Sequence, residues 1–91
     1  MKLYFRNPGC AEEFLEEFAT AEECCEYMNA YLKEREYEPP YWRIVGGKEQ
    51  LMIDFGSYVS FFFVRGITFD LFIPGYRKFY DTWEKRKNNG K

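Results

Sequence analysis

Residues 20–40 read TAEECCEYMNAYLKEREYEPP, and this stretch decides the fold because it defines one helix from its start to its end. Thr20 with Glu23 three residues later is a capping box, in which each side chain satisfies a free N–H at the helix start. Pro39-Pro40 stops the helix. We therefore expect a helix over residues 21–36. Its buried stripe follows helical spacing: Ala21, Cys24, Cys25, Met28, Tyr31 and Leu32.

Before this helix, two short segments predict strands. Residues 2–6 alternate between apolar and polar positions and lead into the turn signal Asn7-Pro8-Gly9. Residues 13–18 fit either a helical turn or a strand that returns along the first one. We favour the strand because the following helix has its own start signal.

After the helix, three segments rich in aromatic and branched residues predict an antiparallel meander, because glycine turns separate them. The segments are residues 41–45, 51–55 and 58–65. In the second, Leu51, Ile53 and Phe55 share one face, and Met52 and Asp54 the other. The third is apolar on both faces, which predicts the central strand.

The C-terminal third is less sharply defined. Residues 67–73 fit a further strand or an extended segment, and Pro74-Gly75 then predicts the start of an amphipathic helix over about 75–87. We expect an α+β fold in one domain, 1–91: a small antiparallel sheet of four to five strands with one helix on each face. The second helix would place these rings on one stripe: Tyr76, Phe79, Tyr80 and Trp83.

Composition excludes several kinds of site. The 91 residues are 22% aromatic, which suits a small core of large rings, and they include no histidine. Without histidine, Ser-His-Asp and Cys-His catalysis is excluded, and the commonest metal ligand is absent. Three cysteines are an odd number, and we expect neither a signal peptide nor a membrane-spanning run, since no segment has the pattern of either. We expect a cytoplasmic protein with free thiols.

The candidate chemical groups favour structural roles. Cys24 and Cys25 point about 100° apart on a helix, so they cannot hold one metal ion together, and we expect them to line the core. Asp54 is expected to pair with Arg43 or to cap a turn with Ser57. We expect no catalytic residue, no metal and no cofactor. An enzyme without histidine would need a deep pocket lined by Asp54 or Asp70.

Charge is divided between the two halves of the chain. Residues 1–40 contain four Lys or Arg and ten Glu, and residues 41–91 contain nine Lys or Arg and five Asp or Glu. The two halves either neutralise each other in the fold or form separate binding faces. If they bind, the acidic helix face is our choice for contact with a basic partner surface: Glu22, Glu23, Glu26 and Glu34.

Three segments carry a resemblance to a known group of proteins: residues 41–43 (YWR), 52–57 (MIDFGS) and 61–63 (FFF). Over residues 12–65 the chain resembles small accessory proteins of phages and prophages of Gram-positive bacteria. The resemblance implies an accessory gene product, and such products often bind and block host proteins, including defence nucleases, as anti-CRISPR proteins do. It implies no catalytic residues.

Our leading hypothesis is therefore a non-enzymatic protein-binding module that inhibits a host protein. The alternative is a single-stranded nucleic-acid binder, in which sheet aromatics stack on bases and a basic C-terminus contacts phosphates. The residues for that alternative are Trp42, Phe61, Phe63, Lys85, Arg86 and Lys87. A homodimer is compatible with both hypotheses, and the aromatic stripe of the second helix is a further candidate contact surface.

Overall fold

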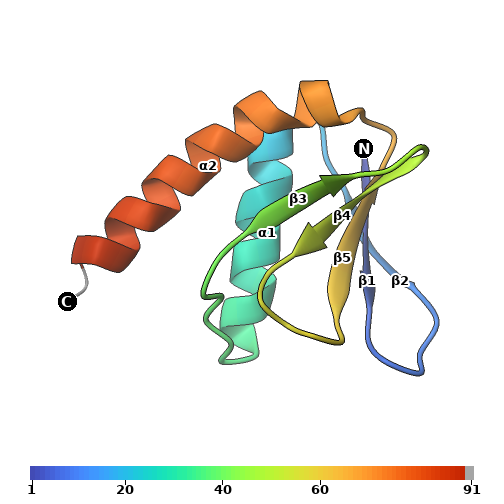
Figure 1. Ribbon diagram of the computed structural model, residues 1–91, viewed down its shortest axis with the longest axis horizontal. Coiled ribbons are helices and arrows are strands. Elements are labelled where there is room, and N and C mark those ends of the chain that lie inside the picture. Colours follow the sequence, from blue (N-terminus) through green and yellow to red (C-terminus); the bar gives the residue numbers. More distant parts are fainter. Residues whose placement is uncertain (90–91) are drawn as a thin grey trace.

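The computed structural model describes residues 1–89, which form a five-stranded antiparallel sheet and two helices (Figure 1). The elements in chain order are β1 (Lys2–Arg6), β2 (Glu13–Glu17), α1 (Ala21–Glu34), β3 (Arg43–Gly46), β4 (Gln50–Asp54), β5 (Phe61–Arg65) and α2 (Phe69–Asn89). The strands lie in the order β2-β1-β5-β4-β3. The predicted α+β class is confirmed.

Helix α1 begins at the predicted capping box. The Thr20 hydroxyl oxygen accepts the Glu23 N–H at 3.2 Å and donates to the Glu23 carboxylate at 2.9 Å. The helix ends at Glu34, two residues earlier than predicted, because Glu36 turns into the left-handed region at φ 59°. The N–H groups of Glu36 and Tyr37 then close the helix end on the carbonyls of Lys33 and Leu32, both at 3.0 Å.

The sheet joins an N-terminal hairpin to the predicted meander. Residues 13–17 pair with β1, so the strand interpretation of this segment is confirmed. Strand β5 lies in the centre, paired with β1 on one side and β4 on the other. It starts at Phe61 rather than at residue 58, because the Ser57 hydroxyl oxygen accepts the N–H groups of Val59 and Ser60 and holds them in a turn.

The expectation of a strand or an extended segment over residues 67–73 was wrong from Phe69 onward. Helix α2 already begins at Phe69, and Pro74 lies inside it. The physical reason is the core contact made by Phe72, which is fully buried and shares a helical stripe with Phe79 and Trp83 further on. The Thr68 backbone carbonyl oxygen accepts the Phe72 N–H at 3.0 Å in the first turn. In residues 1–89, neither helix has an apolar stretch long enough to cross a membrane.

Both helices cover the same face of the sheet, so the predicted helix on each face is wrong. The inner face, under the helices, carries alternate residues of the central strands, among them Leu3, Ile53 and Phe62, and they join α1 and α2 in one core. Figure 1 shows α1 and α2 together beside the sheet, and they contact each other directly. Gly75 permits this approach, since a Cβ there would lie 2.8 Å from the Ala21 Cβ.

Candidate functional site

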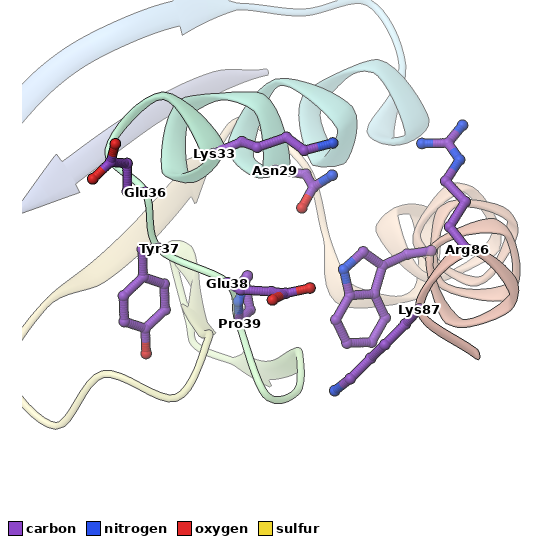
Figure 2. A pocket seen from close by; sticks show the side chains of 9 residues that line it. Asn29, Lys33, Glu36, Tyr37, Glu38, Pro39, Arg86 and Lys87 are labelled. Atoms are coloured by element: carbon purple, nitrogen blue, oxygen red, sulfur yellow. The ribbon is translucent and has the colours of Figure 1, made fainter. Parts of the chain in front are cut away.

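A groove of about 420 Å³ lies between the C-terminal ends of the two helices. Figure 2 shows Asn29 and Lys33 of α1 on one side and Arg86 and Lys87 of α2 on the other. The Lys87 ammonium is already engaged, because it donates to the Pro40 carbonyl at 3.0 Å and lies 4.9 Å from the Trp83 ring centroid. Two carboxylates, Glu36 and Glu38, also line the groove. Its charge is therefore mixed.

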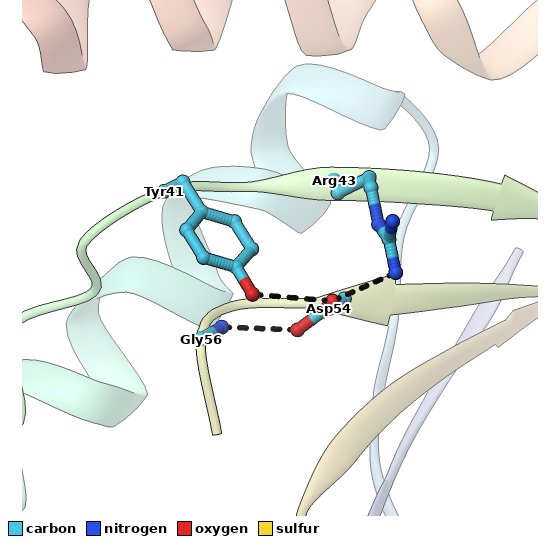
Figure 3. A network of polar contacts seen from close by, with 4 residues as sticks. All are labelled: Tyr41, Arg43, Asp54 and Gly56. Atoms are coloured by element: carbon cyan, nitrogen blue, oxygen red, sulfur yellow. Dashed lines mark hydrogen bonds and ion pairs between the residues drawn. The ribbon is translucent and has the colours of Figure 1, made fainter. Parts of the chain in front are cut away.

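Asp54 is buried at the end of β4, and both of its carboxylate oxygens accept hydrogen bonds from neighbouring residues (Figure 3). One carboxylate oxygen accepts from Arg43 at 3.1 Å and from the Tyr41 hydroxyl at 3.4 Å, and the other accepts the Gly56 N–H at 3.0 Å. The predicted pairing with Arg43 is confirmed, while the turn is capped through Gly56 rather than Ser57. A carboxylate bound in this way holds the turn in place, which is a structural role.

The cysteines occupy the positions expected of structural residues. Cys24 and Cys25 are buried in α1 against the core, as predicted, and Cys10 is exposed. Burial raises the pKa of the Cys24 thiol to about 12 and also raises the pKa of Cys25, so neither is a ready nucleophile. Within residues 1–89, no group of three or more His, Cys, Asp or Glu side chains is placed to hold a metal ion.

The outer face of the sheet, opposite the helices, carries a continuous line of apolar side chains. Residues paired across neighbouring strands share a face, and the pairs Phe14–Tyr4, Tyr4–Phe63, Phe63–Met52 and Met52–Val45 run through all five strands. We call these five residues the apolar row. Phe14 and Val45, at its two ends, are exposed, while Phe63 in the middle is only 4% exposed.

Arginines cover the middle of the apolar row. The Arg6 guanidinium carbon lies 4.8 Å from the Phe63 ring centroid, and that of Arg65 lies 4.4 Å from the Tyr4 ring centroid. Arg65 is held across the sheet, because it donates to the Gln50 amide oxygen at 2.9 Å and to the Glu12 carboxylate. The guanidinium planes shield the rings and still present charge to the solvent.

The predicted acidic residues lie on the solvent side of α1. Glu23, Glu26 and Glu34 are exposed, whereas Glu22 is half-buried and lines a shallow hollow with Gly75 and Lys78 of α2. None of the four glutamates is in an ion pair within residues 1–89, where the ion pairs are Arg43–Asp54 and Arg65–Glu12. Binding through the acidic face stays a prediction.

The residues predicted to bind nucleic acid are not brought together. Trp42 is buried on the inner side, against Phe79 and Trp83 of α2. Phe61 and Phe63 lie on the outer face, with Phe63 beneath Arg6. The basic residues Lys85, Arg86 and Lys87 belong to the last turns of α2, which packs on the inner side. A single-stranded nucleic acid could not contact the three aromatic side chains together.

The apolar row is a candidate contact surface that sequence reasoning missed, since only Phe63 of its five residues was among the predicted site residues. The alternation in β1 and β4 was visible, but the expectation of a helix on each face assigned most rings to the core, and exposed sheet aromatics were considered only for the nucleic-acid alternative. Comparisons with protein-family models, with curated proteins and with solved structures find no significant match to this chain. The resemblance to phage accessory proteins therefore stays a prediction.

Proposed function

We propose that this chain is a non-enzymatic protein-binding module that contacts its partner through the outer face of its sheet. The observation that carries the proposal is the apolar row, which no helix covers within residues 1–89. Aromatic residues, Met and Arg are the side chains enriched at protein interfaces. The outer face combines all three, with Tyr4, Met52 and Arg65 as examples.

Charge on the outer face favours a protein over a nucleic acid as partner. Arg65 is paired with the Glu12 carboxylate of this chain, so part of its charge is already neutralised at the surface. Nucleic-acid binding depends on cations that are free to neutralise phosphates. The acidic face of α1 offers carboxylates without the apolar groups that a stable protein interface needs, which is why the outer face is preferred.

The kind of partner follows the phage-type resemblance. We propose that the chain acts in the cytoplasm as an accessory protein that binds and inhibits a host protein, such as a defence nuclease. The three free thiols of Cys10, Cys24 and Cys25 support a reducing compartment. Inhibition by occlusion needs only a complementary surface and no reactive group on this chain.

Affinity capture from a Gram-positive host lysate tests the proposal. Wild type is compared with Phe14→Ser/Val45→Ser, which changes two exposed ends of the apolar row, and with Leu71→Ser, a matched change at an exposed apolar residue of α2. We expect a discrete partner whose recovery falls at least ~10-fold in the double variant only, a change equal to about 1.4 kcal/mol.

The acidic face is tested in the same capture with Glu22→Lys/Glu23→Lys/Glu26→Lys. Loss of the partner in this variant, with full recovery in the row variant, would move the contact surface from the sheet to α1. A flat fluorescence titration with single-stranded oligonucleotides at low salt is expected. Salt-sensitive binding there would instead identify a nucleic acid as the ligand.

A further inference from the structure

The loop between β4 and β5 displays the most exposed large apolar side chains of the outer region. Tyr58 is 97% exposed and its neighbour Val59 is 58% exposed. Strand β5 carries the outer-face residue Phe61 directly after this loop, so the loop adjoins the outer face at the end of the sheet. Two adjacent apolar residues with so little cover have no folding role that the packing explains.

Hydrogen bonds nevertheless hold the loop in one shape. The Ser57 hydroxyl oxygen accepts the N–H groups of Val59 and Ser60 at 3.3 and 3.0 Å, and the Asp54 carboxylate accepts the Gly56 N–H at 3.0 Å. The Ser60 hydroxyl donates to the Asn7 side-chain oxygen at 2.9 Å, which ties the loop to the far end of β1. Gly56 has φ 95°, and a Cβ there would lie 2.5 Å from Pro40.

A loop that is held in one shape and exposes one aromatic ring is suited to binding. Ordering a flexible loop on binding costs free energy. This loop is already ordered by the hydrogen bonds of the fold, so binding does not carry that cost. Tyrosine is enriched among the residues that dominate interface energies, since it buries a large ring with only two rotatable bonds. Tyr58 therefore has the features of an anchor residue.

Charge beside the loop defines the partner's complementary surface. In the Arg43–Asp54 pair the Arg43 side chain is 66% exposed, whereas the Asp54 side chain is 9% exposed. The cation thus faces the solvent while the anion is hidden. Tyr41, which donates to Asp54, is itself exposed beside this pair. A partner that meets this region needs carboxylates around the pocket that receives the ring.

We propose that Tyr58 and Val59 form the anchor of the interface, inserting into an apolar pocket with an acidic rim on a protein partner. The inference rests on the proposed function and deepens it, because it names the contact that contributes most to affinity and the chemistry of the surface that accepts it. The outer face then supplies the surrounding contact area, and Arg43 faces the acidic rim.

Site-specific photo-crosslinking tests the anchor. The full chain carries p-benzoylphenylalanine at position 58, at position 45 in the apolar row, or at position 71 as a matched exposed control on α2. Each is irradiated in host lysate, with excess unlabelled wild type or Tyr58→Ser as competitor. We expect one discrete adduct from positions 58 and 45 and none from position 71, with Tyr58→Ser competing at least ~10-fold more weakly than wild type.

The outcomes separate the two proposals. An adduct from position 45 but not from 58, or a Tyr58→Ser competitor as strong as wild type, overturns the anchor and leaves the outer face in place. No adduct from either position, or equal adducts from all three, overturns the proposed function as well. An Arg43→Glu competitor that matches wild type contradicts the acidic rim, and adducts that nuclease treatment removes identify a nucleic acid instead.

Discussion

The two faces of the sheet cover large aromatic rings by different means. Both present phenylalanines of β5, since Phe62 points inward and Phe63 outward, and both rings are almost completely buried. Phe62 is enclosed by other rings, among them Phe5, Phe55 and Tyr31. Phe63 is instead covered by the guanidinium of Arg6. A low exposed fraction therefore does not distinguish a ring enclosed in the core from a ring at the surface that a single arginine covers.

The largest test of this difference is a pair of truncations on neighbouring residues. Phe62→Ala is expected to lower the free energy of unfolding by about 3–5 kcal/mol, because close-packed rings cannot collapse into the cavity. Phe63→Ala is expected to cost only about 2 kcal/mol, close to the transfer term, since Arg6 and water can occupy the space. Urea denaturation measures both. Equal losses would contradict the distinction between the two faces.

The contact between helices on the inner face gives the next largest effect. An alanine in a helix is ordinarily more stable than a glycine by about 1 kcal/mol. Gly75→Ala is expected to do the opposite and lower stability by about 1–3 kcal/mol, because its Cβ would lie 2.8 Å from both the Ala21 Cβ and the Glu22 nitrogen. Thermal unfolding checks the sign. A more stable variant would show that the helices can separate easily.

Alkaline pH should act on the inner face through its buried thiols. Burial raises the pKa of Cys24 from 9.0 to about 12, so the unfolded chain loses its proton first. The contribution of this thiol to stability is therefore fully present below pH 9 and is lost as the pH rises toward 12. At pH 10 the loss from this thiol is about 1 kcal/mol. Denaturation at pH 8 and pH 10 measures the loss. Cys24→Ala should reduce it, whereas Cys10→Ser should leave it unchanged.

The smallest expected effect concerns the cover of the outer face. Arg6→Ala removes the cation above Phe63 and should cost only about 0.5 kcal/mol of stability. The uncovered ring should, however, increase the fluorescence of an apolar dye such as ANS. Arg77→Ala, at an exposed arginine of α2, serves as the control. Unchanged dye binding in Arg6→Ala would show that the guanidinium does not shield the row.

Local signals predicted most elements of the fold. The capping box predicted the start of α1, and the glycine turns predicted the meander. The alternation of Leu51 to Asp54 predicted correctly which side chains of β4 lie on each face of the sheet. The start of α2 was missed because Ile67, Thr68 and Phe69 have strand-like propensity, while the core position of Phe72 decides the matter. Propensity is a local preference, and a buried tertiary contact outweighs it.

The candidate site was less predictable than the fold. The Arg43–Asp54 pair followed from register in a hairpin, which sequence can suggest. The apolar row could not be recognised, because it depends on which face the second helix covers. That choice is made by the close contact at Gly75 and by the burial of Trp42 beneath Phe79, both of which are long-range. Tyr58 was assigned to a strand, so its exposure was not expected.

Strand β2 lies at the margin of the sheet, and one of its edges has no neighbouring strand in residues 1–89. Such an edge invites pairing with another copy of the chain, and charged side chains discourage it. Three of the five residues of β2 are glutamates, Glu13, Glu16 and Glu17. Their mutual repulsion between molecules works as a built-in safeguard against fibrils. Replacing these glutamates by glutamine, which removes that repulsion, should turn the same strand into the starting point of aggregation.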